Sequence, residues 1–299
     1  MNKRAPAAAV IVCTWNRASL LSENIASILR QDADDWEAVY VNDGSTDNTA
    51  AVLAEAVADH PDRIRCITTE NRGPGPARNR GVQAVRADYI LFLDDDATAP
   101  PGWIRGMLAA RERRQARALC GGILPHRIET PAERYLHYRM QTTLGPRPKI
   151  LRGAPAGNLL VERALFEAVG GFPELRLPAG EDWALSQRIR AAGARIHYDP
   201  AAPVVHRYDR DLERVRAVVR RMGAAGVDLQ RLAGRPPAPY VALSTLRSIA
   251  APATIPLHYP PDLYLTALRM EWAFARGRLA AYFAASAGAD ASDASDPNA

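Results

Sequence analysis

The chain has 299 residues, of which 47% are hydrophobic and 24% charged. These are ordinary globular values, and the length suits one large domain or one domain with an appendage. The formal net charge is +5, and almost all of the positive charge is arginine because Lys3 and Lys149 are the only lysines. Arginine favours phosphate and carboxylate, which suggests an anionic ligand or an acidic membrane surface, although a compositional bias of the genome explains the same excess. There is no block of basic residues, so we expect no nucleic-acid partner.

The apolar and polar residues of the first half alternate in the pattern of βαβ units. Short apolar runs typical of buried strands are separated by segments with apolar residues at helical spacing, which predicts a parallel sheet with right-handed crossovers. The expected strands are 7–14, 36–43, 63–69 and 89–94, and the expected helices are 19–31, 47–60, 76–87 and 102–116.

The second half is less regular. We expect a strand at 118–124, a strand and a short helix ended by glycines at 156–172, a helix at 180–193, and two short strands at 194–200 and 202–208. After Asp209 the chain turns mainly helical, with a long amphipathic segment at 263–285. The predicted division is therefore 1–209, a helical extension at 210–285, and a small, polar and disordered tail at 286–299.

The three cysteines and the N-terminus point to an intracellular protein. Cys13, Cys66 and Cys120 are far apart, lie in apolar contexts and form no CxxC motif, as expected for buried, reduced thiols in the cytoplasm. The apolar run near the N-terminus passes straight into a polar turn, so it predicts a first strand rather than a signal peptide. No apolar stretch of about 18 residues occurs, and we expect no transmembrane helix.

Unusual polar residues follow the predicted strands where each strand ends. Thr14 and Asn16 follow the first, Asp43 ends the second, and the triplet "DDD" at 94–96 follows the fourth. In an open parallel sheet this edge is where ligands bind. Carboxylates of this kind hold Mg²⁺ or Mn²⁺ together with phosphate oxygens, although an acidic loop that caps the helix around Trp103 is the alternative. Neither a GxxxxGK[ST] nor a GxGxxG loop is present, which argues against P-loop NTPases and dinucleotide dehydrogenases.

A series of motifs resembles the family 2 glycosyltransferases of the GT-A fold. It consists of "CTWNR", "VNDGSTDNT", "ARNRG", "YILFLDDDA", "GNLLVERALFEAVGGF" and "GEDWALSQRIRAAG", in family order from about Val10 to His206. The resemblance implies an α/β fold with a mainly parallel central sheet flanked by helices. It also implies a catalytic domain at 1–209, with a nucleotide-binding half at about 1–117 and an acceptor half at 118–209.

On the donor side, the resemblance implies a nucleotide pocket at the ends of the first two strands. Asp43 would accept a hydrogen bond from the base of the donor, with Thr14 and Asn16 lining the same pocket. Arg78 would approach the diphosphate, although a solvated arginine is the alternative. The neighbours of Asp43, at 45–47, also suit a turn and a helix N-cap, and for these three we favour the structural role.

For the acidic triplet, the resemblance implies that Asp94 or Asp95 holds the ribose and that Asp96 binds Mn²⁺ or Mg²⁺. His206 lies where some members of the family place a further metal or diphosphate contact. A histidine after an apolar strand is more often satisfied by its local surroundings, so both interpretations stay open.

On the acceptor side, the resemblance makes Asp182 the catalytic base, with Glu181 orienting the acceptor or supporting the loop. One base and no second carboxylate nucleophile suit single displacement with inversion. The alternative is that both acids only compensate the dipole at the start of their helix.

The expected function is an inverting, metal-dependent glycosyltransferase that uses a nucleotide-diphospho-sugar, with UDP favoured, and a carbohydrate or lipid-linked acceptor. The Q/RxxRW motif of processive synthases is missing, which favours single addition. The C-terminal helices would cover the acceptor cleft, pair subunits, or make a peripheral contact with the inner face of the membrane. Arginines on an amphipathic helix fit the membrane contact, although a solvated helical face is the commoner explanation. The alternatives are a sugar-phosphate nucleotidyltransferase, disfavoured by the lack of glycine after the first strand, and a non-catalytic nucleotide-sugar-binding protein.

Overall fold

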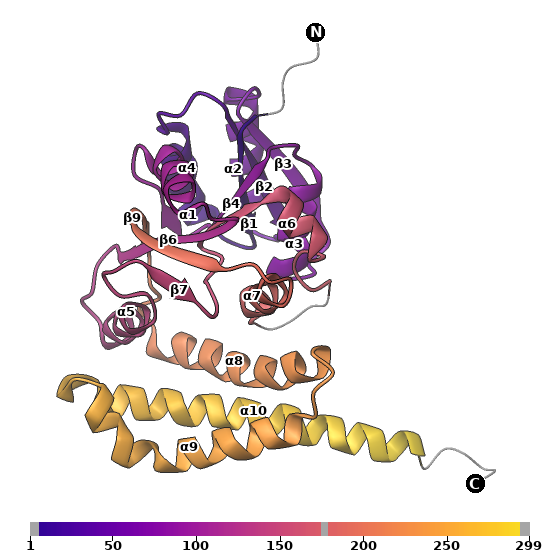
Figure 1. Cartoon of the computed structure of the whole chain (residues 1–299), viewed down its shortest axis with the longest axis vertical. Helices are drawn as coiled ribbons and strands as arrows, with labels where there is room; N and C mark the ends of the chain where they lie inside the picture. Colours follow the sequence, from indigo (N-terminus) through magenta and orange to yellow (C-terminus); the bar gives the residue numbers. More distant parts are fainter. Residues whose placement is uncertain (1–5, 175–178, 294–299) are drawn as a thin grey trace. The chain divides into compact units, whose positions relative to one another are not determined.

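The structure is a computed structural model that describes residues 6–174 and 179–293, with side chains to residue 284 (Figure 1). The chain divides into two compact units. The first unit holds the sheet and comprises Met1–Arg127, Arg139–Arg176 and Glu181–Arg207. The second unit is helical and comprises Ile128–Tyr138, Leu177–Gly180 and Tyr208–Ala299. The domain boundary that the sequence predicts, at residue 209, is close to Tyr208, where the last segment of the second unit begins. The sequence did not indicate that 128–138 belongs to the second unit.

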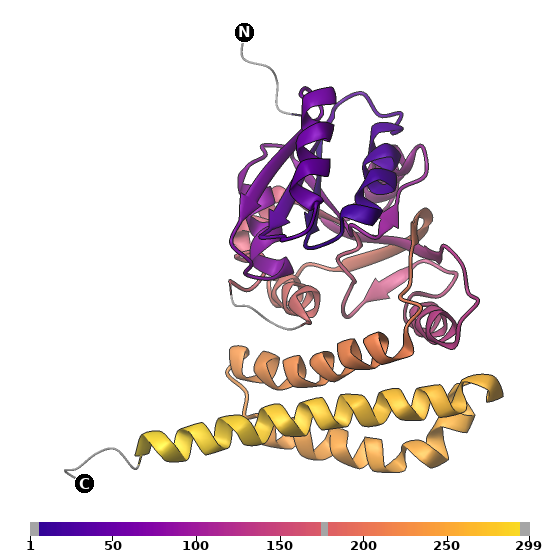
Figure 2. The same cartoon turned by 180° about the vertical axis from the view of Figure 1, so that it is seen from behind.

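The first half of the sheet is parallel, in the strand order β3-β2-β1-β4. All four strands expected from the apolar runs are confirmed, and β1 is buried along almost its whole length. Helices α1 and α2 lie behind the strands in Figure 1 and in front of them in Figure 2. The elements are β1 (Ala8–Thr14), α1 (Ala18–Leu29), β2 (Trp36–Asp43), α2 (Thr49–Asp59), β3 (Ile64–Thr69), α3 (Pro74–Gln83) and β4 (Tyr89–Leu93).

The second half of the sheet is mixed. Strand β8 is antiparallel to both β4 and β6, whereas β6 and β9 are parallel. The elements are β5 (Ala97–Thr98), α4 (Trp103–Arg114), β6 (Ala118–Pro125), α5 (Pro131–Leu144), β7 (Lys149–Leu151), β8 (Asn158–Glu162), α6 (Arg163–Ala168), α7 (Glu181–Ala191) and β9 (Ile196–His206). The expectation of two short strands at 194–208 was wrong. One strand, β9, covers this region, and its pairing with β6 shifts register between Gly121 and Ile123. Pro200 and Pro203 lie in β9 and cannot donate to a ladder, which is why the sequence looked interrupted there.

The second unit consists mainly of three long helices that run alongside one another (Figure 1). They are α8 (Leu212–Leu232), α9 (Pro237–His258) and α10 (Tyr264–Asp293), with the short 3₁₀ helix η1 (Pro261–Leu263) before α10. Val219, Ile255 and Met270 contribute to their common core. Among the described residues, no helix is long and apolar enough to cross a membrane.

The last helix extends further than the sequence predicts. We expected disorder from residue 286, whereas α10 continues to Asp293. Three of the eight residues from 286 to 293 are alanine, the residue with the highest helix propensity, which favours continuation of the helix through this small and polar sequence. The rest of the predicted tail, 294–299, lies outside the described residues.

Candidate active site

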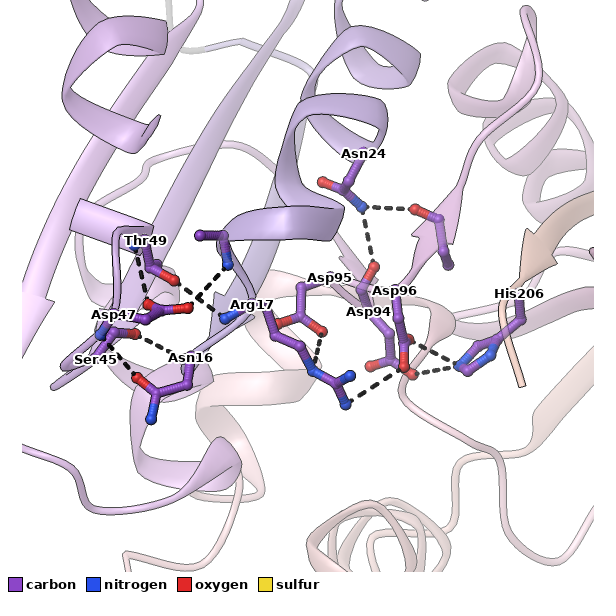
Figure 3. A network of polar contacts seen from close by, with 12 residues as sticks. Asn16, Arg17, Asn24, Ser45, Asp47, Thr49, Asp94, Asp95, Asp96 and His206 are labelled. Carbon is purple, nitrogen blue, oxygen red and sulfur yellow. Dashed lines mark hydrogen bonds and ion pairs between the residues drawn. The ribbon is translucent and has the colours of Figure 1, made fainter. Parts of the chain in front are cut away.

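The acidic triplet lies in a turn between β4 and β5, and hydrogen bonds from a side chain of α1 hold the backbone of this turn. The side-chain amide of Asn24 in α1 donates to the carbonyl oxygens of Asp94 (3.0 Å) and Ala97 (2.7 Å) (Figure 3). Asn24 is itself oriented, because the hydroxyl of Tyr40 donates to its Oδ1 at 2.7 Å. Since both side chains are buried, they fix the turn rigidly at the carboxyl end of the parallel strands.

Three cationic side chains surround the triplet. Arg78 from α3 donates to Oδ1 of Asp94 at 2.9 Å, and Arg17, which precedes α1, lies 4.0 Å from Asp95 and 3.7 Å from Asp96. The third is His206, whose Nε2 lies 3.1 Å from Oδ1 of Asp96 and 3.5 Å from Oδ2 of Asp94 (Figure 3). The repulsion between adjacent carboxylates is therefore offset by opposite charges on other elements.

Sheet register brings His206 to the triplet. Strand β9 pairs with β5 in an antiparallel ladder in which Ala97 lies opposite His206, so the imidazole stands beside the turn that ends at Asp96. One ligand atom from each of Asp94, Asp96 and His206 lies within 4.8 Å of the others. Two carboxylates and one imidazole fit a divalent cation such as Mn²⁺ that accepts both oxygen and nitrogen ligands.

The charges in this cluster are strongly coupled. Burial alone would raise the pKa of Asp94, but the hydrogen bond from His206 and the charge of Arg78 outweigh it and lower this pKa to about 2. Burial would lower the pKa of His206, yet Asp96 and Asp94 raise it to about 9. The imidazole is therefore protonated at neutral pH, and its positive charge offsets the negative charges of the two carboxylates.

Asp95 has a different environment from its two neighbours. Burial, with a further contribution from the charge of Asp96, raises its pKa to about 7, against the opposing effects of Thr14 and Arg17. Thr14 is buried at the end of β1, as the sequence placed it. This carboxyl group points toward Arg17 rather than toward His206 (Figure 3), so it is separate from the potential metal ligands.

Arg78 connects the triplet to the acidic pair at the start of α7. Its guanidinium donates to Oε1 of Glu181 at 2.7 Å as well as to Asp94, and it lies over the ring of Phe172. The side chain is buried, so the alternative of a solvated arginine was wrong. Glu181 is thus held by a charged partner. Arg78 hydrogen-bonds Glu181 and Asp94 but not Asp182.

The surroundings of Asp182 raise the pKa of its carboxyl group. Burial raises this pKa to about 7, with a further contribution from the charge of Glu181, against the opposing hydrogen bond from the Trp183 N–H. That N–H donates to Oδ1 of Asp182 at 2.6 Å. Both acids lie in the first turn of α7, where they also compensate the helix dipole.

Asp43 is buried and already engaged with the loop before α3. Its carboxylate accepts hydrogen bonds from the N–H groups of Arg72 (3.0 Å) and Gly73 (2.8 Å) and from the hydroxyl of Thr69 (3.3 Å). It therefore fixes the loop that leads to Arg78. A donor base would have to share this carboxylate, and the predicted role of Asp43 in binding that base stays a prediction.

Asn16 joins two loops at the same edge of the sheet. Its Oδ1 accepts from the N–H groups of Thr46 (2.7 Å) and Asp47 (3.3 Å), and its own N–H donates to the hydroxyl of Ser45 (2.9 Å). The backbone of Asn16 is left-handed, with φ of 52°, which asparagine tolerates better than most residues. These contacts give Asn16 a structural role in shaping the edge, and its predicted contact with the donor is untested.

The interpretation of residues 45–47 as structural is supported by their contacts. Asp47 accepts from the N–H of Thr49 at the start of α2 (3.0 Å) and from the N–H of Ala18 at the start of α1 (3.2 Å). One carboxylate thus satisfies free donors at two helix N-termini, and Figure 3 shows the link.

Two residues of this network were not identified from the sequence. Arg17 belongs to the "CTWNR" motif, but nothing in the motif shows that it would lie opposite Asp95 and Asp96. Asn24 carries no sequence signal, because a polar residue in an amphipathic helix ordinarily faces water.

With this geometry established, comparison with known proteins identifies the family. The model of the family "Glycosyl transferase family 2" matches residues 9–170, which is more than half of the chain. The chain belongs to glycosyl transferase family 2. The match begins in β1 and ends just after α6, so it includes the acidic triplet and Arg78 but not α7 or His206.

Curated relatives agree with this family 2 assignment. The chain is 28% identical over 214 residues to a glucosyl-dolichyl phosphate glucuronosyltransferase of Haloferax volcanii, an alignment that covers 66% of this chain and 68% of the relative. For three other curated relatives the match covers only 30%, 29% and 42% of their own length.

Two solved glycosyltransferases share the fold. The mannosyltransferase PcManGT of Pyrobaculum calidifontis, in complex with GDP-Man and Mn²⁺, superposes with a TM-score of 0.64 at 21% identity, over 93% of this chain and 88% of that one. TarS of S. aureus, in complex with UDP-GlcNAc, has a TM-score of 0.56 at 18% identity, over 74% of this chain and 66% of that one. At these identities the similarity establishes the GT-A fold that the sequence predicted.

Proposed function

We propose that this family 2 protein is an inverting, metal-dependent glycosyltransferase that transfers one sugar from a nucleotide-diphospho-sugar to an acceptor hydroxyl. The observation that carries the proposal is the pairing of two acidic groups through one arginine. Arg78 bonds both Asp94, in the potential metal cluster, and Glu181, which adjoins the potential base Asp182. Through these two bonds, Arg78 would hold the donor site at Asp94 and the proton acceptor Asp182 at a fixed distance from each other.

On the donor side, Asp96 and His206 would hold a divalent cation, with Asp94 as a third ligand. The bound metal would act as a Lewis acid that neutralises the leaving diphosphate. Asp95, turned away from this cluster, would hold the ribose, and Arg78 would face the diphosphate. Thr14, Asn16 and Asp43 would form the base pocket.

On the acceptor side, Asp182 would accept the proton of the attacking hydroxyl. A pKa of about 7 lets this carboxylate be largely ionised near neutral pH and still be basic enough to take a proton. Glu181 is engaged with Arg78 at 2.7 Å, so it is not free to act as a second nucleophile. A single base favours direct displacement, and therefore inversion at the anomeric carbon.

UDP is our favoured nucleotide, in keeping with the UDP-GlcNAc complex of TarS, while the GDP-Man complex of PcManGT makes GDP the principal alternative. The Haloferax relative is named for a lipid-linked acceptor, glucosyl-dolichyl phosphate. We propose a carbohydrate or lipid-linked acceptor for this chain as well.

Calorimetric titration tests the donor assignment. UDP, GDP and dTDP would be titrated into the protein with Mn²⁺ or with a chelator, and then into Asp96→Ala. Metal-dependent binding of one nucleotide that Asp96→Ala abolishes would support the proposal. The matched control is Asp59→Ala, which removes an exposed carboxylate at the end of α2 and should bind like the native protein. If no nucleotide binds under any metal condition, the proposal is wrong.

A further inference from the structure

Helix α10 in the second unit carries apolar and basic residues in one exposed row. The row contains Leu265, Arg269, Trp272, Arg276, the partly buried Leu279, and Phe283, which are spaced three or four residues apart and so lie on one helix face. Leu265 is 72% exposed, Trp272 47% and Phe283 62%. Large apolar side chains in a row on a water-facing surface usually mark a binding site.

Helix α8 adds more arginines beside this row. Arg216, Arg220 and Arg221 line a groove of about 390 Å³ together with Arg276 of α10. An adjoining hollow of about 520 Å³, also lined by Arg216 and Arg276, is extended by Arg269 and Trp272. The arginines of two helices therefore face the same depression.

Close contact between the two helices makes this surface rigid. A Cβ atom at Gly277 would collide with the backbone carbonyl of Arg220, and one at Gly223 would collide with that of Phe274. The backbones of α8 and α10 thus touch where the groove lies, and the arginines project from a fixed base.

Most of these arginines have no acidic partner. Among the residues that the structure describes, no carboxylate lies within ion-pair distance of Arg220, Arg221, Arg269 or Arg276, whereas Arg216 pairs with Glu213 at 2.9 Å. Four uncompensated guanidinium groups on one surface produce a positive potential that favours an anionic partner.

We propose that this surface docks on an anionic phospholipid bilayer. We call it the α10 surface and define it as Leu265, Arg269, Trp272, Arg276 and Phe283 together with Arg220 and Arg221. The arginines would reach lipid phosphates, Trp272 would lie at the headgroup level, and Leu265 and Phe283 would enter the acyl boundary. Helix α10 would lie along the membrane plane, since no described helix meets the length and hydropathy needed to cross it. The proposal does not depend on the chemistry proposed for the first unit.

A second copy of the chain fits this surface less well. A two-fold contact would place arginine against arginine, because the acid that lines the groove, Glu213, is already paired with Arg216. A nucleic acid would use the arginines and Trp272 but leave Leu265 and Phe283 without an apolar partner. A bilayer satisfies both kinds of side chain.

The test is sedimentation of the full chain with vesicles of phosphatidylcholine, with or without phosphatidylglycerol. We expect salt-sensitive binding to the anionic vesicles and little to the neutral ones. Arg220→Gln/Arg276→Gln should weaken the partition by about 25-fold, since each basic residue near an anionic surface contributes roughly fivefold. The charge-matched control is Arg30→Gln/Arg86→Gln, which removes two exposed arginines of the first unit and should bind nearly as well as the native chain.

A second pair of variants distinguishes binding through the α10 surface from non-specific hydrophobic binding by other exposed leucines. Leu265→Ser/Phe283→Ser should weaken binding, whereas Leu243→Ser/Leu246→Ser, which removes two leucines of α9 that are 73% and 64% exposed, should not. Thermal melting confirms that each variant folds. Absence of binding to anionic vesicles, equal loss in the control variants, or tighter binding to duplex DNA than to vesicles would overturn the proposal. The proposal would also be overturned if the native chain bound no vesicles but formed a concentration-dependent dimer that only the α10 variants dissociate.

Discussion

Arg78 donates a 2.7 Å hydrogen bond to Glu181, a residue 103 positions further along the chain. The same guanidinium bonds Asp94, so it is buried between two carboxylates that belong to different elements. Its pKa is raised above the ordinary value because the charges of the neighbouring groups outweigh its burial. This arginine holds α3, the acidic turn and α7 in one arrangement.

Replacing Arg78 should therefore destabilise the fold. Arg78→Met removes the cation that Asp94 and Glu181 share and leaves Asp94 with His206 alone. We expect a loss of about 3 kcal/mol in the free energy of unfolding, measured by urea denaturation at neutral pH. Arg80→Met, at an exposed position of the same helix, is the control and should change little. Equal stability of the two variants would contradict the structural role given to Arg78.

Removal of the proposed base should abolish transfer without affecting the donor. For Asp182→Asn we expect kcat to fall by about 10²- to 10⁴-fold, the usual contribution of a general base, with unchanged affinity for the nucleotide. Steady-state transfer and nucleotide calorimetry on the same preparation measure both quantities. Asp59→Asn should behave as the native protein, and unimpaired transfer by Asp182→Asn would exclude this residue as the base.

The transfer rate should depend on pH through the same carboxyl group. Its pKa is raised to about 7, so the group is protonated and inactive as a base below that pH and ionised above it. With saturating donor and metal, we expect the rate to rise with pH through about 7 and then level off. The residual transfer rate of Asp182→Asn, which lacks this carboxyl group, serves as the reference and should not rise with pH in the same way. A rate that falls across this range would require a different proton acceptor.

Metal affinity should also rise with pH. The pKa of His206 is raised to about 9 by the two aspartates beside it, so metal binding at neutral pH must displace a proton from the imidazole. We expect the affinity for Mn²⁺ to increase by up to about tenfold per pH unit below 9, as follows for one displaced proton. In His206→Gln this dependence should disappear. A native protein whose Mn²⁺ affinity does not vary with pH would exclude His206 from the ligand set.

The shared cap at Asp47 should contribute to stability and not to chemistry. Asp47→Ala removes the acceptor for the N–H groups of Thr49 and Ala18, and we expect the midpoint of unfolding to fall, because two helix N-termini then lose a hydrogen-bond partner. Chemical denaturation measures it, with Asp59→Ala as the surface control. A loss of nucleotide affinity with unchanged stability would instead indicate a direct contact with the donor.

The local pattern of apolar and polar residues was sufficient to predict the strands and helices of the first half and the polar residues at the ends of the strands. Strands buried on both faces are continuous apolar runs, and this property depends only on neighbouring residues. The same reasoning failed at β9, where Pro200 and Pro203 interrupt the pattern while a single strand continues. It also missed α5 and the short strands β5 and β7, which are too short or too weakly periodic to stand out.

The sequence by itself determined the order of strands and helices in the first half, the polar residues at their ends and the family motifs. Tertiary structure alone decided which charges meet. His206 faces Asp96 because β9 pairs with β5 in one particular register, and Arg17 faces Asp95 because two loops come together at one edge of the sheet. The spacing of residues along a chain specifies a helix or a strand, but a contact across a sheet depends on register and packing, which no local pattern contains.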